Sequence, residues 1–396
     1  MGLLIFILPT ALAAIPKGGS IVVLMLILSV VGLTIKRERM KLNKWEKYFV
    51  LSFVFYFFVV AVNLWWFDGK LHDLDTPSRL LLVLPIFFFI RKFNINSNWF
   101  IWGVVVTSLM VGINQVAVHF NYNTLYFFQD NSGIMTLFAS ILGLMSLLFM
   151  STEKSKIANF LFFSVAILGI TASFLLGGRG VWIAAIMSLV FIGLVNPMSW
   201  SGGARVFIIG LFVSVFIATY LVPQTGVKDR LTQATSNVAQ WSENGKSSTS
   251  AGARLEMWKA SYQVIKENPF FGVGEDNYSK YQQILVNQGK VSKAVEGFLH
   301  PHGEYVTSLV EQGFIGLLAF ISVLLAPLTY LLCRIKSNKN SYRLRVLTTS
   351  GLLIILHYAV YSVTSGVFDH QSTALFYSVF MATILGLIKS NSRIEV

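Results

Sequence analysis

Cysteine occurs only once in the 396 residues, as Cys333. A single thiol excludes a disulfide within the chain and a metal site built from cysteines. Charge is scarce as well, at 12% of the residues, and the sequence has no Rossmann-type glycine fingerprint, no internal repeat and no coiled-coil pattern. These absences leave neither a disulfide framework, nor a dinucleotide-binding fingerprint, nor a repeat array as the basis of the fold.

Apolar residues dominate what is present. They make up 55% of the chain, and the mean hydropathy is +0.65. A chain of this size with so little charge is typical of a polytopic membrane protein. The net charge of +13 suggests nucleic acid only if the basic residues form one patch. They are divided among the loops between apolar runs, so we expect no nucleic-acid partner.

Twelve apolar runs of about 15 to 25 residues are candidates for membrane-spanning helices. We read the first as a short transmembrane helix; a cleaved signal peptide is the alternative, but a basic n-region is missing. The run at 80–90 reaches spanning length only if its helix begins at Pro77–Arg79 and Lys92 extends to the interface. The runs are 2–15, 19–35, 48–66, 80–90, 99–118, 131–150, 157–176, 180–195, 205–222, 304–332, 346–366 and 371–388.

The basic residues orient these spans. When the chain is threaded through the membrane twelve times, one side collects eighteen Lys and Arg residues, and the other side has four outside its one long loop. Because basic residues concentrate in cytoplasmic loops, both termini are predicted to be cytoplasmic. The long loop is then on the outer face.

This loop, residues 224–303, is the one segment between the spans that is large enough for an extramembrane subdomain. Apolar stripes at helical spacing predict helices over Val227–Asn244 and Gly252–Asn268, and Asp276 and Gly289 bound a third. The predicted organisation is therefore transmembrane helices 1–9 in 1–223, a helical loop subdomain in 224–303, and helices 10–12 with a short tail in 304–396.

Three arginines are the cationic candidates on the outer face. Arg179 lies in Gly-Gly-Arg-Gly, where the glycines let the backbone approach a ligand and the guanidinium suits phosphate oxygens. The alternative is a tight turn with an arginine at the lipid head groups. Arg254 is read on its own as a surface helix charge, and Arg79 as an interfacial anchor paired with Asp75.

His300 and His302 precede the tenth span in HPHGE, where Pro301 predicts that the helix begins at Gly303–Glu304. Histidine accepts a proton near neutral pH, so His302 is a candidate base, and His300 could share that role. A zinc site from His300, His302 and Glu304 is weighed but not favoured, because the sequence offers no fourth ligand.

Six motifs occur in order along nearly the whole chain: LDTPSRLLL at 74–82, Asp130-Asn131, GGRG at 177–180, RLEMW at 254–258, NPFFGVG at 268–274 and HPHGEYVTSLVEQGFIGLL at 300–318. Together they resemble the O-antigen ligase family of bacterial envelope enzymes. Its superfamily also holds O-antigen polymerases and protein O-oligosaccharyltransferases. The chain departs from the family at Gly303, where an asparagine commonly follows the histidine.

The resemblance implies a GT-C-like glycosyltransferase of lipopolysaccharide biosynthesis in the bacterial inner membrane. It would move O-antigen from undecaprenyl pyrophosphate to a sugar hydroxyl of the lipid A core on the periplasmic face. The reaction would invert the anomeric centre and need no metal or other cofactor. Its partners would be the lipid-linked O-antigen, lipid A core and membrane lipids.

Site roles follow from the same resemblance. The expected catalytic residues are His302, Arg179 and Arg254, and the expected substrate-binding residues are Arg79, His300 and Glu304. The alternatives within the superfamily are a polymerase and a protein O-oligosaccharyltransferase. A polysaccharide flippase is less favoured, because the spans carry few charges at mid-membrane depth.

Overall fold

The computed structural model describes residues 2–15, 19–35, 40–122, 132–150, 152–175, 178–195, 199–244, 247, 249–337 and 341–391. These residues form α-helices and short 3-10 helices, with no strand among them. The elements are α1 Gly2–Ala13, α2 Gly19–Ile35, α3 Lys44–Trp66, η1 Leu71–Leu74, α4 Asp75–Leu82, α5 Leu84–Lys92, α6 Asn98–His119, α7 Ser132–Phe149, α8 Lys156–Leu175, α9 Arg179–Val195, α10 Gly202–Leu221, η2 Pro223–Thr225, α11 Val227–Asn244, α12 Ser250–Glu267, η3 Glu275–Asn277, α13 Tyr278–Asn287, η4 Lys293–Val295, α14 Glu304–Ser337, α15 Tyr342–Tyr361 and α16 Gln371–Asn391.

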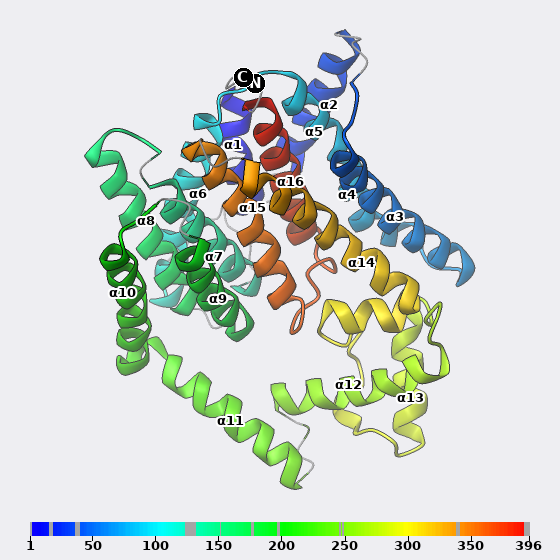
Figure 1. Ribbon diagram of the computed structural model, residues 1–396. Coiled ribbons are helices and arrows are strands. Elements are labelled where there is room, and N and C mark those ends of the chain that lie inside the picture. Colours follow the sequence, from blue (N-terminus) through cyan, green and yellow to red (C-terminus); the bar gives the residue numbers. More distant parts are fainter. Residues whose placement is uncertain are drawn as a thin grey trace.

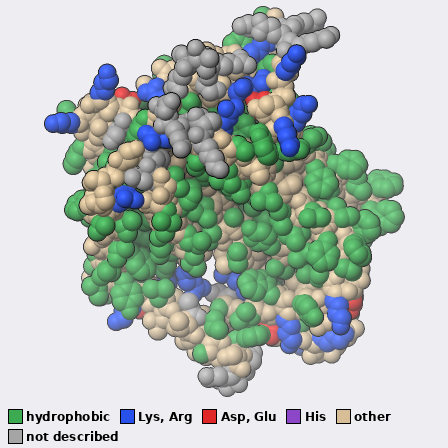
Figure 2. Space-filling model, in the orientation of Figure 1, with side chains coloured by type: hydrophobic (Ala, Val, Ile, Leu, Met, Phe, Trp, Pro, Cys, Tyr) green, Lys and Arg blue, Asp and Glu red, His purple; other side chains and the backbone are tan. Residues whose placement is uncertain are grey.

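The arrangement confirms the prediction of an all-α polytopic membrane protein. Within the described ranges, seven helices are long and apolar enough to cross a membrane: α3, α6, α8, α10, α14, α15 and α16. Four shorter apolar helices, α1, α2, the part of α7 from Gly133 and α9, accompany them. Figure 2 shows a broad belt of hydrophobic side chains with Lys and Arg gathered mainly at one end of the molecule. Both chain termini lie at that end, and α11 to α13 lie at the opposite end (Figure 1).

Helix α16 lies at the centre of the bundle. Almost nine-tenths of its most apolar 18-residue stretch is buried within the protein. Phe376 stacks on Phe138 of α7 with ring centroids 4.4 Å apart, and Tyr377 donates a hydrogen bond to the Val323 carbonyl of α14. Close packing of this kind replaces the hydrophobic effect as the force that holds helices together in lipid.

The weakest predicted span, 80–90, is a pair of short helices rather than one. Helix α4 ends at Leu82, and α5 begins at Leu84 with Pro85 in its first turn. Proline has no amide hydrogen to donate to the preceding turn, so a continuous helix through Pro85 is broken there. At the far end of α5, buried Arg91 forms an ion pair with Glu46 at 2.9 Å, which fixes α5 to the start of α3.

Helix α14 is broken at Gly313, where the sequence predicted one continuous span. The Gly313 backbone has a φ of 68°, in the left-handed region. On one side of the break, the Val310 and Glu311 carbonyls accept hydrogen bonds from the Val273 and Gly274 amides, both at 2.9 Å. On the other side, the Phe314 amide donates to the Pro269 carbonyl at 2.8 Å. The NPFFGVG loop therefore supplies the hydrogen bonds that the broken helix lacks.

Side chains secure the same junction. The Asn63 amide of α3 donates to the Phe271 carbonyl at 2.9 Å and to the Glu311 carbonyl at 3.1 Å. A Cβ at Gly313 would overlap the Phe270 carbonyl, and one at Gly272 would overlap the Glu311 carbonyl. The two glycines therefore allow a close approach that any side chain would prevent.

We expect Gly313→Ala to lower the free energy of unfolding by about 3 kcal/mol, because it combines a left-handed conformation with overlap in a packed junction. Thermal unfolding of the purified protein in detergent, followed by tryptophan fluorescence, measures this. Gly210→Ala is the matched control, since nothing lies within 4 Å of a Cβ at that helical position. Equal melting temperatures for the two variants would contradict the role of the junction.

The loop between α10 and α14 has an apolar core of its own. This core contains Met257, Val264, Tyr278 and Val295, and Val310 of α14 packs into it. The helices α11, α12 and α13 lie within one or two residues of the predicted helices. Because Val310 belongs to this core, the first turns of α14 pack with the loop as well as with the bundle.

Candidate active site

Two arginines that the sequence analysis singled out line one cavity. Arg179 is the first residue of α9, and Arg254 lies in the second turn of α12. Both border a cavity of about 530 Å³, together with Trp258 of α12 and Tyr361 at the end of α15. We call it the cationic cavity, because two arginines and, among the described residues, no carboxylate line it. It lies at the end of the molecule where Figure 1 places α11 and α12.

A third arginine, Arg230 of α11, lies beside Arg179. An Arg179 guanidinium nitrogen donates to the Arg230 carbonyl at 3.3 Å, and the Arg230 guanidinium donates to the Leu175 carbonyl at 2.8 Å. Burial and then the charge of Arg179 lower the pKa of Arg230 and the pKa of Arg254 below their ordinary values. Arg179 therefore repels both other cations, and no carboxylate is among the described residues that line the cavity. An anion there, near the N-terminus of α9, would be stabilised.

The segment 299–304 contacts a residue that lines the cationic cavity, Trp258. The Trp258 indole donates to the Pro301 carbonyl at 3.1 Å. A Cβ at Gly303 would come within 2.9 Å of the Val363 carbonyl, so glycine fits the close approach to the loop after α15. The Glu304 amide, the first of α14, donates to the Ser362 carbonyl of that loop at 2.8 Å. The asparagine common in the family would not fit here without a backbone shift.

His302 is held in this segment in an unusual conformation. Its φ is 53°, which non-glycine residues rarely adopt and which costs of order 1–3 kcal/mol. The imidazole is half-buried and packs edge-on against Phe298, with ring centroids 5.7 Å apart. Burial, followed by the charge of Arg254, lowers the pKa of His302 below its ordinary value of 6.5. His302 is thus neutral near pH 7 and available to accept a proton.

His300 has the opposite electrostatics. Its Nδ1 lies 3.0 Å from a carboxylate oxygen of buried Glu311. Burial lowers the pKa of His300, but the hydrogen bond and charge of Glu311 outweigh burial and raise it to about 9. His300 is therefore protonated near neutral pH. The geometry separates the two histidines: His302 is suited to be a base, and His300 is half of an ion pair.

His300 and Glu311 face a second cavity, of about 280 Å³, which Leu299 and Glu304 also line. We call it the acidic cavity, because five carboxylates and, among the described residues, no Lys or Arg line it. Glu304 is one of them, and its Oε2 accepts a hydrogen bond from the Phe368 amide at 2.9 Å. The polar lining residues are His72, Asp73, Thr76, Glu275, Ser279, His300, Glu304, Thr307, Ser308, Glu311, Gln312, Asp369 and Gln371.

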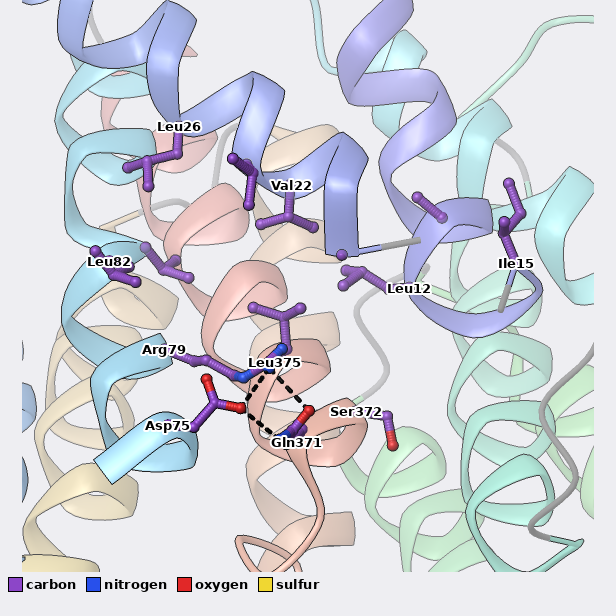
Figure 3. A pocket seen from close by; sticks show the side chains of 14 residues that line it. Leu12, Ile15, Val22, Leu26, Asp75, Arg79, Leu82, Gln371, Ser372 and Leu375 are labelled. Carbon is purple, nitrogen blue, oxygen red and sulfur yellow. Dashed lines mark hydrogen bonds and ion pairs between the residues drawn. The ribbon is translucent and has the colours of Figure 1, made fainter. Parts of the chain in front are cut away.

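Arg79 lies apart from the other arginines, in a third cavity of about 520 Å³. Figure 3 shows it at the polar end of an otherwise apolar cavity, next to Asp75 and Gln371. Its guanidinium lies 2.8 Å from an Asp75 carboxylate oxygen and 2.8 Å from the Gln371 side-chain oxygen. The structure therefore gives Arg79 the anchoring pair with Asp75 that the sequence left as an alternative to a substrate contact.

The remaining predicted site features have mixed outcomes. Asp130-Asn131 and Gly177 lie outside the described residues. No group of three or more His, Cys, Asp or Glu residues in the described part of the chain has a geometry suited to a metal ion. Sequence reasoning missed Arg230 and Glu275 altogether, because each lies in a polar loop stretch with nothing in the sequence to indicate what it faces.

Comparison with known proteins places the site in a family. Residues 162–321 match the family model described as O-antigen ligase. A protein of Haemophilus influenzae (strain ATCC 51907 / DSM 11121 / KW20 / Rd), described as uncharacterized, is 26% identical over 390 residues, which cover 95% of both chains. The matched segment runs from α8 into α14 and includes Arg179, Arg254 and both histidines. Over residues 162–321 the chain is thus similar to the O-antigen ligase family.

Proposed function

We propose that this protein is an O-antigen ligase. It would transfer O-antigen from undecaprenyl pyrophosphate to a sugar hydroxyl of the lipid A core, at the periplasmic face of the inner membrane. The observation that carries the proposal is the pair of cavities of opposite charge, with a neutral histidine, His302, that feels the charge of Arg254 from one and of Asp369 from the other. A lipid pyrophosphate fits the cationic cavity by charge, and a hydroxyl-bearing acceptor fits the acidic one.

Each of the three catalytic residues has its own role in the proposed reaction. Arg179 and Arg254 bind the pyrophosphate and stabilise the negative charge that grows on it. The acceptor oxygen attacks the anomeric carbon while the bond from that carbon to the phosphate oxygen breaks. The bonding electron pair leaves with undecaprenyl pyrophosphate, and the acceptor proton goes to the His302 imidazole. Attack opposite the leaving group inverts the anomeric centre.

The electrostatics of this site reduce the need for a metal. Many sugar transferases use a divalent cation to neutralise the leaving phosphates. Guanidinium groups supply the same positive charge here with a fork of donors that matches phosphate oxygens. We therefore propose a metal-independent, nucleotide-free reaction on a GT-C-like scaffold.

A reconstituted reaction tests the proposal. Purified protein is incubated with undecaprenyl-pyrophosphate-linked O-antigen and rough lipopolysaccharide, with and without EDTA, and the products are separated by gel electrophoresis. We expect a ladder of O-antigen on lipid A core that EDTA does not reduce. Elongated glycan that stays on the lipid carrier would instead identify a polymerase. Glycosylation of an added protein acceptor would identify a protein O-oligosaccharyltransferase.

The fall of the transfer rate at acidic pH should follow the protonation of His302. Its neutral form is the base, so the transfer rate falls as the pH drops through its folded-state pKa, which burial and then the charge of Arg254 hold below 6.5. The rate should therefore reach its plateau before pH 7, and removing the Arg254 charge should move the midpoint upward. The charges of Asp369, His300 and His370 also shift the pKa of His302, and all three residues are unchanged in the Arg254 variant. A midpoint near 9 would assign the base to His300 instead.

A further inference from the structure

The carboxylates of the acidic cavity favour some ligands over others. Five carboxylates line it, from Asp73, Glu275, Glu304, Glu311 and Asp369, and its lining includes no lysine or arginine. The protonated His300 is already committed to Glu311 at 3.0 Å. A ligand group that carries phosphate or carboxylate would meet repulsion there without a compensating cation. A ligand rich in hydroxyl groups would find acceptors for its hydrogens.

The cavity also holds a polar atom that has no partner. Thr307 is 2% exposed and lines the cavity, and its hydroxyl oxygen has no hydrogen-bond partner among the described residues. A buried hydroxyl left unpaired costs about 1–3 kcal/mol, which a ligand would recover by bonding to it. This position lies on the same face of α14 as Glu304 and Glu311, one helical turn from each.

Donors and acceptors are both available around Thr307. Burial, then the charges of Glu311 and Asp73, raises the pKa of Glu275 to about 8. Glu275 therefore carries a proton at neutral pH and can donate, while other carboxylates of the cavity accept. A sugar hydroxyl needs both kinds of partner, since it donates one hydrogen and accepts through its lone pairs.

Size and position fit a single ring next to the base. The volume of about 280 Å³ is at the lower end of the range for ligand cavities, roughly 300–1,000 Å³. The loop after α15 borders both cavities, with Thr364 and Ser365 on the cationic side and Phe368 and Asp369 on the acidic side. His302 feels the charge of Arg254 from the cationic cavity and that of Asp369 from the acidic cavity, so a ring bound beside Asp369 would lie on the acceptor side of the base.

We propose that the acidic cavity is the acceptor subsite and that it takes one sugar ring without anionic substituents, while it rejects rings that bear phosphate or carboxylate. This inference rests on the proposed function, because it concerns the acceptor of the same reaction. It adds a rule of substrate choice: the sugar that receives the glycan is neither phosphorylated nor a uronic acid.

Binding of two matched monosaccharides, with no donor present, tests the inference. Saturation-transfer NMR on the purified full-length protein in detergent at pH 7 is titrated with methyl glucoside and with methyl glucuronide, which differ in one carboxylate. We expect the glucoside to bind and the glucuronide to bind at least about tenfold more weakly. Thr307→Val, which keeps the side-chain shape, should weaken glucoside binding about fivefold. Thr235→Val, at an exposed position of α11, should leave it unchanged.

The carboxylates are tested by the double variant Asp73→Asn/Asp369→Asn. It should bring the two sugars to within about threefold of each other, because it removes two of the acidic groups. Equal binding of both sugars to the wild type, no binding of either, or discrimination that survives the double variant would each overturn the inference. Transfer to lipid A core without sugar discrimination would sink this inference alone. Sugar discrimination without any transfer would sink only the proposed function.

Discussion

His302→Asn lowers the rate of glycan transfer by about a hundredfold to ten-thousandfold, the contribution typical of a positioned general base. Asparagine is the informative replacement, because it tolerates positive φ better than most residues, and His302 has a φ of 53°. The variant therefore removes the base while it leaves the backbone of the 299–304 segment in place. Transfer is measured in the reconstituted reaction with both substrates saturating.

Variants of two other histidines serve as controls for this result. His119→Ala, at the exposed end of α6, removes an imidazole that contacts the Gln224 carbonyl and should leave the rate at the wild-type level. His300→Gln should cost less than His302→Asn and should act mainly on the KM for the acceptor, since His300 pairs with Glu311 in the acidic cavity. A larger loss of kcat for His300→Gln than for His302→Asn would refute the assignment of the base.

Arg254→Gln has the second largest expected effect, a loss of about a hundredfold to a thousandfold in the transfer rate. Removal of one preorganised donor from a developing oxyanion typically costs this much. Arg254 borders a cavity whose lining includes no carboxylate, and its charge and that of Arg179 repel each other. A bound pyrophosphate would offset this repulsion. Arg254→Lys should recover only part of the rate, because a lysine lacks the forked donor.

Lys259→Gln is the matched control on the same helix. It removes one positive charge from α12 at an exposed position, and it should change transfer less than twofold. If Lys259→Gln and Arg254→Gln reduce transfer equally, the effect comes from the net charge of the loop subdomain and not from a contact in the cationic cavity. Binding of undecaprenyl pyrophosphate alone, measured by its protection against thermal unfolding, separates donor affinity from the chemical step.

Much of the fold was readable from composition and periodicity. Apolar length predicted each span, and the stripes over Val227–Asn244 predicted α11 with its observed bounds. Length alone did not reveal the break at Gly313, because its hydrogen bonds come from residues about forty positions earlier. Pro85 accounts for the break between α4 and α5. The break was not predicted, because the apolar residues on either side of Pro85 form one continuous apolar run.

The candidate site, like the fold, could be predicted from the sequence only in part. Motifs in a fixed order pointed to Arg179, Arg254 and the histidine segment, and the structure brings the two arginines to one cavity. Sequence spacing could not assign different roles to His300 and His302, because the difference depends on Glu311 on one side and Arg254 on the other. It also grouped Arg79 with the other arginines by membrane side alone. How deep each residue lies and how far apart two residues are on one side of the membrane depend on helix packing. Assigning residues to loops on that side does not give this information.

The junction at Gly313 bears on how this protein can be recombined with its relatives. Val310 and Glu311 are hydrogen-bonded to the NPFFGVG loop, and Val310 packs into the core of that loop subdomain. A chimera that exchanges 224–303 and stops at the predicted start of the span would pair a foreign loop with a native helix end, and would separate His300 from its own Glu311. The transferable unit should instead end at Gly313, so that the loop moves between homologues together with the start of the helix to which it is bonded.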